Sequence, residues 1–391
     1  MADRGALEAA AAAGVINPEQ VGPLHDFLSS RAAGVRAAPG GEEDLRFIRN
    51  FHDVFLAIGI ALFAIGLAIG IGTFAADAGD VRSGTSLAGV LCAGAAVVMW
   101  VLGELFARRR RLFLPAIAIV CSLTIFAIIA AALIYAGVLL GREFETQPNW
   151  SSIPPELRNG ILISAAFGIV APLAFYARFR LPFSLGLAGG GFAAFVVVAA
   201  LIWNAEQTLA LLPALYLGLG LLLFAAGVGF DARDPERNTR FSDNGFWLHF
   251  AAAPFLLNGA FGLIGQAFGG DSLEALSPSG GLLAAGVQGD AVLQAAATLL
   301  VVVALGLVSL LINRRVLIVS ALLTTGVAIG ILMNSVGLGA GALAASTLTV
   351  LGAFVLILGA GWHAVRRALL AWVKPNGAWA RIFPPEAPAA A

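Results

Sequence analysis

The sequence predicts an all-α fold: a polytopic transmembrane helical bundle of about ten spans, preceded by a small N-terminal cytoplasmic helical hairpin. Three observations support it. Of the 391 residues, 59% are hydrophobic and only 12% are charged, about half the charge of a typical soluble domain. Apolar runs of roughly 20 residues, the length that crosses a bilayer core of about 30 Å, recur along the chain. The Lys and Arg residues also alternate between successive loops.

The apolar runs define the predicted spans. They lie near residues 53–73, 84–106, 112–140, 160–177, 181–203, 209–230, 246–268, 290–312, 316–336 and 339–362. The stretch 269–289 contains no such run, and we interpret it either as an extracytoplasmic loop with a short helix or as a shallow re-entrant segment. The chain then divides into a hairpin (1–30), a linker with a juxtamembrane helix (31–52), the transmembrane bundle (53–362) and a cytoplasmic amphipathic tail (363–391).

The distribution of Lys and Arg predicts the orientation. With both termini in the cytoplasm, 20 of the 23 Lys and Arg residues lie on the cytoplasmic side, and only Arg82, Arg142 and Arg158 lie opposite. Cytoplasmic loops of membrane proteins carry such an excess of positive charge. We therefore expect a multi-pass protein of a bacterial cytoplasmic (inner) membrane, with the N-terminus and the C-terminus inside.

The residues before the first span have the pattern of two short helices. "LEAAAAAG" reads as a helix that stops at Gly14, and "INPEQVGPLHDFL" starts another. Asn17 fits its N-cap, Pro18 the first helical position and Gln20 a capping box. These features predict the hairpin.

Two stretches resemble a known family. "AAAAGVINPEQ", followed by a linker and "RFIRNFHDVFLAIGIALF", is similar to the start of a bacterial family of predicted multi-pass membrane proteins of unknown function. Those proteins begin with a Gly-x-Ile-x-Pro-Glu-Gln type helical hairpin, and "DPERNTRFSDNGFWLHFAAAP" is similar to a block in some of their relatives. The resemblance implies the hairpin and the bundle, but it implies no activity and no site residue.

The polar block "DARDPERNTRFSDNGFWLHF", residues 231–250, interrupts the apolar sequence. We predict that residues 231–245 form the cytoplasmic loop between the sixth and seventh spans. Asp234 before Pro235 fits the start of a short surface helix, and Ser242 fits the N-cap of the seventh span. The loop is either a solvated connector or a gate or docking surface. The candidate residues for a gate are Arg233, Arg237, Arg240 and Asp243.

Polar side chains inside spans are the other candidates for a site, because they are costly in a bilayer and often mark a function. Glu104 lies near the end of the second span and fits an ion pair with Arg108 four residues later. Pro254 is expected to kink the seventh span. The candidate intramembrane polar residues are His249, Asn258, Gln266, Gln294 and Asn334. Hydrogen bonds between helices are the alternative explanation for them.

These features restrict the function. The net charge of zero argues against nucleic acid as a partner. No enzyme signature, metal-ligand spacing or cofactor motif is present, so we expect no cofactor, and the chain does not indicate an enzyme. Few acids lie within the spans, which disfavours a carboxylate-driven proton antiporter.

Two main hypotheses remain. The first is a membrane protein that binds or transports a small neutral or amphipathic molecule. The second is a scaffold or sensor that recruits a cytoplasmic protein partner through its hairpin. A membrane enzyme that acts on lipid is a third alternative. All three place the chain in contact with the lipid bilayer.

Overall fold

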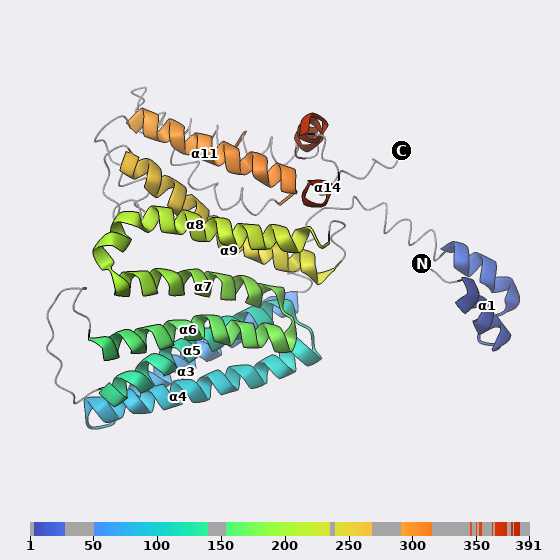
Figure 1. The fold of residues 1–391 in the computed structure, drawn as a ribbon. Coiled ribbons are helices and arrows are strands. Elements are labelled where there is room, and N and C mark those ends of the chain that lie inside the picture. The colour runs from blue at the N-terminus through green and yellow to red at the C-terminus, as the bar shows by residue number, and fades with distance from the viewer. Residues whose placement is uncertain are drawn as a thin grey trace.

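The computed structural model describes residues 4–27, 51–139, 154–234, 239–267 and 291–314, and shorter stretches between 345 and 383. Within these residues every regular element is a helix. In the described part of the chain, seven helices, α3 to α9, are long and apolar enough to cross a membrane. They lie side by side in one bundle (Figure 1). This confirms the predicted all-helical fold and the apolar bundle.

The helices agree with the predicted spans within a few residues, apart from the start of α9. Their bounds are α3 Phe51–Ala76, α4 Val81–Gly103, α5 Phe113–Leu139, α6 Pro155–Phe179, α7 Pro182–Trp203, α8 Ala205–Asp231, α9 Arg240–Ala267 and α11 Ala291–Ile312. A π-helical turn, η2 (Glu104–Arg109), extends α4, and a short helix, α14 (Trp379–Ile382), lies near the C-terminus. The predicted eighth span corresponds to α11. The segment 269–289 and the ninth span lie outside the described residues, as does nearly all of the tenth.

Helices that follow one another in the chain pack against one another. α3, α4 and α5 form one group, α6 joins α5 to α7, and α7 packs on both α8 and α9. α8 and α9 make the most extensive pairing, and α11 lies against α9 (Figure 1). The turns after α4 and α6 and the start of α9 therefore lie at one end of the bundle. We call this the arginine-rich end, because it carries Arg108 to Arg111, Arg178, Arg180 and Arg240.

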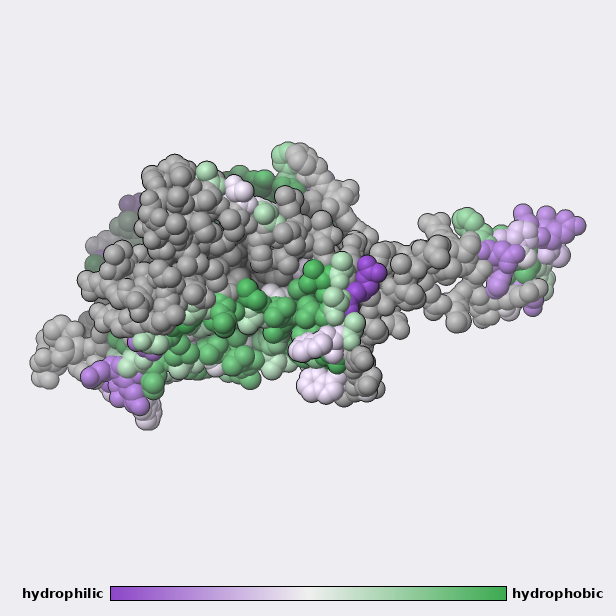
Figure 2. Space-filling model, turned by 90° about the horizontal axis from the view of Figure 1, so that it is seen from above, coloured by the Kyte–Doolittle hydropathy of each residue, from purple (hydrophilic) through white to green (hydrophobic). Residues whose placement is uncertain are grey.

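The outer surface of the bundle is apolar. Large hydrophobic side chains of α3 are exposed, among them Leu62, Ile65 and Ile69, each more than half accessible. Among the described atoms visible in Figure 2, hydrophobic residues occupy the middle of the bundle and hydrophilic ones lie toward its ends. Such an exposed apolar surface is unfavourable in water and favourable in lipid. The structure is thus compatible with an integral membrane protein.

Small residues allow close helix packing inside the bundle. A Cβ atom at Gly220 of α8 would lie 2.7 Å from the backbone nitrogen of Leu256 of α9. At Gly259 of α9 it would overlap the backbone nitrogen of Leu217 of α8, which leaves no room for a side chain. Close approach through small residues is how membrane helices gain packing energy. By contrast, a Cβ atom at Gly66 or Gly70 of α3 would meet no atom of the described residues within 4 Å.

The first described residues form a separate helical piece. α1 (Arg4–Ala12) is followed by a turn and by the 3₁₀ helix η1 (Pro18–Gln20), and residues 21–27 are helical. The backbone N–H of Asn17 donates to Gln20 Oε1 at 3.0 Å, as the predicted capping box requires. Figure 1 shows α1 away from the bundle. The pairing of two helices into a hairpin stays a prediction.

Candidate functional site

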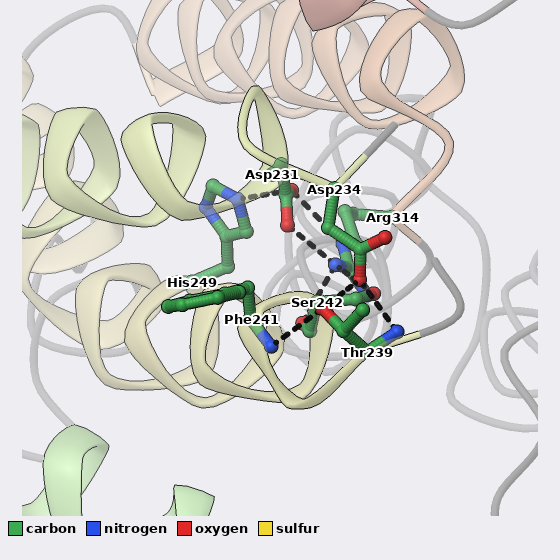
Figure 3. A network of polar contacts seen from close by, with 7 residues as sticks. All are labelled: Asp231, Asp234, Thr239, Phe241, Ser242, His249 and Arg314. Atoms are coloured by element: carbon green, nitrogen blue, oxygen red, sulfur yellow. Dashed lines mark hydrogen bonds and ion pairs between the residues drawn. The ribbon is translucent and has the colours of Figure 1, made fainter. Parts of the chain in front are cut away.

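Three charged or titratable side chains meet inside the bundle near the arginine-rich end. They are Asp231 of α8, His249 of α9 and Arg314, which follows α11 (Figure 3). Their side chains are 11%, 0% and 3% exposed, respectively. We call them the buried charge cluster. Because a buried charge is costly unless it is paired, such a group needs an explanation.

α8 places the acid at an unusual position. Asp231 is the last residue of α8, and the N–H of Ala232 still donates to the carbonyl of Val228 at 2.8 Å. The C-terminal end of a helix carries a partial negative charge, which disfavours a carboxylate. Asp231 therefore depends on a cation from another part of the chain.

α9 presents one face to this carboxylate. Ser242, Gly245 and His249 are spaced by three and four residues, which places them on one side of the helix. A Cβ atom at Gly245 would overlap Asp231 Oδ1, so only glycine leaves space for the carboxylate there. The imidazole of His249 packs on the ring of Phe224, with centroids 4.9 Å apart. Helical spacing thus builds the α9 side of the cluster.

α11 supplies the cation through its C-terminal cap. Asn313 has a left-handed backbone (φ 55°), and its N–H donates to Leu310 O at 3.2 Å. The N–H of Arg314 donates to Ser309 O at 2.8 Å. These two bonds form a Schellman motif, in which asparagine is a favoured substitute for glycine. The cap turns the chain so that the side chain of Arg314 points back toward α8 and α9 (Figure 3).

The guanidinium of Arg314 binds both oxygens of the acid. Nε donates to Asp231 Oδ2 at 3.1 Å and Nη2 to Oδ1 at 2.5 Å. Nη2 also contacts the carbonyl oxygen and the hydroxyl of Ser242, at 2.8 and 2.9 Å. A bidentate arginine–carboxylate pair is a strong, charge-assisted contact. Arg314 thereby joins the ends of α8 and α11 to the first turn of α9.

The histidine completes the carboxylate's contacts. His249 Nε2 lies 3.1 Å from Asp231 Oδ2. Since Asp231 accepts from arginine through both oxygens, it is ionised and can only accept a hydrogen bond. The N–H of His249 Nε2 therefore donates a hydrogen bond to Asp231 Oδ2. A neutral imidazole can take up a further proton on its second ring nitrogen, so His249 is a member of the cluster whose charge can change with pH.

Hydrogen bonds join Asp234, which follows α8, to Thr239, which precedes α9. α9 begins at Arg240, so the prediction that residues 231–245 form the loop is wrong: Asp231 belongs to α8. Asp234 Oδ2 accepts from the N–H and the hydroxyl of Thr239, at 2.8 and 2.6 Å (Figure 3). The N–H of Phe241 donates weakly to Thr239 Oγ1 at 3.3 Å.

Thr239 is the residue directly before α9, a position that was predicted for Ser242. The predicted N-cap at Ser242 is therefore wrong. Ser242 lies inside α9 and is buried, and its hydroxyl accepts a hydrogen bond from Arg314. Asp243 lies in the first turn of α9. The short helix expected after Asp234 lies outside the described residues.

The cluster contains the residue types of a serine hydrolase, but not the arrangement. In a catalytic triad the histidine lies between the acid and the nucleophile. Here Ser242 Oγ contacts Arg314, and the cluster is closed to solvent. Within the described part of the chain, no group of His, Cys, Asp and Glu could hold a metal ion. The geometry fits a structural role: the polar contacts of the cluster hold α8, α9 and the end of α11 together. We call this role a polar lock.

Two predicted polar residues of α9 have other partners. Asn258 donates to the carbonyl of Pro254 in its own helix, at 2.7 Å. Gln266 donates to the carbonyl of Ala210 in α8, at 2.9 Å. Among the candidates whose side chains are described, His249 alone belongs to the buried charge cluster. The expected kink at Pro254 stays a prediction.

The remaining intramembrane candidates are not placed by the structure. Gln294 belongs to α11, but its side chain lies outside the described residues, and so does all of Asn334. Their role as intramembrane site residues stays a prediction.

The candidates for a cytoplasmic gate separate in space. Arg233 lies over the ring of Phe230, 5.8 Å from its centroid. Arg240 and Asp243 line a cavity at the arginine-rich end. Arg237 lies outside the described residues.

The predicted ion pair at the end of the second span is confirmed. Glu104 Oε2 accepts from Arg108 at 3.1 Å, and Oε1 accepts from Arg178 Nε of α6 at 2.6 Å. The contact between Glu104 and Arg178 joins the π-helical turn η2 to α6. The three side chains are between 32% and 56% exposed, in contrast to the buried charge cluster.

Sequence reasoning found His249 but missed its partners. Asp231 was assigned to the cytoplasmic loop, and Arg314 was counted only among the positive charges of the cytoplasmic side. One signal was available: Asp231 directly follows the apolar run of the sixth span, without an intervening turn residue. The structure therefore adds a buried acid to the spans, and the argument against proton coupling that rested on the lack of such acids is weakened.

Comparison of the chain with protein-family models, with curated proteins and with solved structures found no match.

Proposed function

We propose that the chain is an integral membrane protein that binds or transports a small neutral or amphipathic molecule. The observation that supports this most is the buried charge cluster, which connects α8, α9 and α11. Ionisable groups inside membrane helices usually serve a function, because their cost must be offset. In our proposal Asp231 and Arg314 hold the three helices in one arrangement.

His249 gives this lock a way to open. Protonation of His249 adds a positive charge beside Asp231 and competes with Arg314 for the same carboxylate. Among the described residues, Asp231 and Phe224 of α8 contact His249, and Arg314 reaches the shared carboxylate from the end of α11. The equilibrium between two helix arrangements then depends on the proton and on the bound molecule.

A binding screen with a matched variant tests the transport proposal. The purified chain and His249→Gln, which keeps a hydrogen-bond donor without a titratable ring, are tested by thermal shift. The probes are a panel of uncharged sugars, polyols and amphipathic dyes. We expect one class to stabilise the wild type, and we expect uptake of that class into proteoliposomes to depend on pH only in the wild type. No stabilisation by any class, together with no uptake, contradicts the proposal.

We further propose the orientation that the positive charges indicate, with both termini cytoplasmic in a bacterial inner membrane. Reporter fusions or cysteine accessibility at residues 108–111, 231–240 and 366–391 should place all three on the cytoplasmic side. A periplasmic result for residues 231–240 contradicts this topology.

A recruiting role for the N-terminal piece is the second candidate. The described residues 4–27 expose Val15 (75%) and Phe27 (58%), and α1 stands away from the bundle (Figure 1). Deletion of residues 1–41 separates the two functions. Uptake that survives the deletion, with no change in any cellular output, supports a transporter alone, whereas loss of a cellular output supports recruitment.

A further inference from the structure

A cavity of about 490 Å³ opens at the arginine-rich end of the bundle. Its charged lining residues are Asp53, Arg108, Arg111, Arg178, Arg180, Arg240 and Asp243. Five arginines thus face two aspartates, an excess of three positive charges. We call this space the arginine cavity. Its volume is in the range of small-molecule sites.

The arginines converge from three separate parts of the chain. Arg108 and Arg111 come from the turn between α4 and α5, Arg178 and Arg180 from the turn between α6 and α7, and Arg240 from the start of α9. Positive charge in cytoplasmic loops is common in membrane proteins. These arginines also line the same cavity. The orientation of the protein in the membrane does not require positive charges from three loops to share a cavity, so their convergence needs another explanation.

Three of these arginines are available to a ligand. Arg108 and Arg178 share Glu104. Arg111, Arg180 and Arg240 form no ion pair with another described residue. An anion in the cavity would therefore meet guanidinium groups that are not already neutralised.

Two of the three adopt a backbone conformation that arginine rarely takes. Arg111 (φ 53°) and Arg180 (φ 56°) are left-handed, and Asn313 is the other non-glycine residue of this kind among the described residues. Asparagine tolerates this conformation well, whereas arginine does so at a cost. Strained residues of this kind gather at binding sites, where the side chain is needed. Both strained arginines line the arginine cavity.

We propose that the arginine cavity binds a phosphate group. Guanidinium groups bind phosphate through paired hydrogen bonds, and several of them together provide the affinity. The rest of the wall includes Ala116, Phe179 and Leu181, so the site is apolar on the bundle side and basic elsewhere. This combination accepts an anionic phospholipid headgroup or a soluble phosphorylated molecule. The inference does not depend on the proposed transport function.

The experiment has two arms that separate the sources of phosphate. In the first, the full chain is placed in nanodiscs of phosphatidylcholine with or without phosphatidylglycerol, and lipid retention is measured by native mass spectrometry. In the second, inorganic phosphate and pyrophosphate are titrated into pure phosphatidylcholine nanodiscs and binding is measured by calorimetry. Ionic strength is held constant with chloride, since screening alone alters charge interactions. Binding in the first arm identifies a lipid site, and binding in the second identifies a soluble ligand.

Variants assign the binding to the cavity. Arg180→Asn removes the charge but tolerates the left-handed backbone, and Arg240→Gln removes a charge from the start of a regular helix. Each should weaken phosphate binding about tenfold, the value of one charge-assisted contact. Arg180→Lys should retain part of the affinity.

The control is Arg233→Gln, which removes one positive charge near the same end but outside the cavity lining. It should bind as the wild type does. An equal loss in Arg233→Gln, or no binding in either arm, overturns the proposal. If Arg180→Asn fails to fold, Arg240→Gln decides the outcome.

Discussion

Two acids at the arginine-rich end are each held by an arginine from a distant helix, yet their surroundings differ. Glu104 meets Arg178, 74 residues later in the chain, where both side chains are about a third or more exposed. Asp231 meets Arg314, 83 residues later, where both are nearly closed to solvent. Water screens the first pair, which therefore contributes little. The second pair has lost its hydration, so that each charge depends on the other.

The comparison predicts its largest effect at the buried charge cluster. Asp231→Asn leaves Arg314 buried without a counter-charge, and removing one partner of a buried pair costs about 3–5 kcal/mol. We expect this loss in the free energy of unfolding, measured by denaturant titration in detergent micelles. The double variant Asp231→Asn with Arg314→Gln should recover part of the loss. A loss below about 1 kcal/mol in the single variant would show that water reaches the cluster.

The tight packing around His249 predicts the next largest loss of stability. A Cβ atom at Gly227 of α8 would lie 2.8 Å from His249 Cε1, whereas one at Gly229 of the same helix would meet nothing within 4 Å. Gly227→Ala should cost about 1–3 kcal/mol, because the imidazole is packed and cannot move freely. Gly229→Ala is the matched control and should be neutral or slightly stabilising. Equal thermal shifts for the two variants would mean that His249 is loosely held.

The hydroxyl of Ser242 tests a smaller part of the same cluster. Ser242→Ala removes one acceptor from Arg314 and should cost about 1 kcal/mol. If the residue acted only as a helix cap, Ser242→Asn would restore stability, since asparagine is a good cap. We expect no such rescue in thermal unfolding, because Ser242 lies inside α9.

The exposed pair should respond weakly. Glu104→Gln should lower the melting temperature far less than Asp231→Asn does. The difference from wild type should shrink further as salt is raised, because exposed charges are screened. Melting curves at low and high salt measure this. A large effect that does not change with salt would place Glu104 in the same class as Asp231.

Asp80 is a third acid, and its partner Ser83 lies in the same turn. We expect it to make a small contribution to stability that depends on pH. The backbone N–H of Ser83 and, next, its hydroxyl donate to Asp80 and lower the pKa of that carboxyl. A lowered pKa stabilises the fold above the ordinary value of 3.8, and this is lost as the pH falls through the lower folded value. Asp80→Asn should remove this dependence and keep the cap of α4. Melting temperatures from about pH 2 to 7 test it; identical profiles for variant and wild type contradict it.

The sequence predicted the bundle because its signals are local. Apolar runs are recognised from their length and local composition alone, and they located α3 to α8 within a few residues and α9 except for its start. The Asn17–Gln20 cap was also local, as was the Glu104–Arg108 pair four residues apart. Each of these needs only the geometry of a single helix.

The buried charge cluster could not be predicted in the same way. Its acid and its arginine lie 83 residues apart, and no periodicity relates them. The start of α9 was misplaced because "RFSDNG" is polar and looked like a loop. Ser242, Asn244 and Gly245 are buried and contact other parts of the chain, not water. Their contacts are with Arg314, with Tyr176 of α6 and with Asp231 of α8, respectively. Tertiary contacts decided what hydropathy could not.

The distance along the chain between Asp231 and Arg314 has a consequence for biogenesis. Ribosomes add about 5–20 residues per second, so roughly 4–17 s pass between the synthesis of the acid and of its cation. During that interval α8 and α9 enter the bilayer with a carboxylate that has no arginine to neutralise it. A chain released before α11 would keep this charge uncompensated. Membrane quality-control proteases that recognise polar groups in lipid would then have a direct way to distinguish an unfinished chain from a complete one.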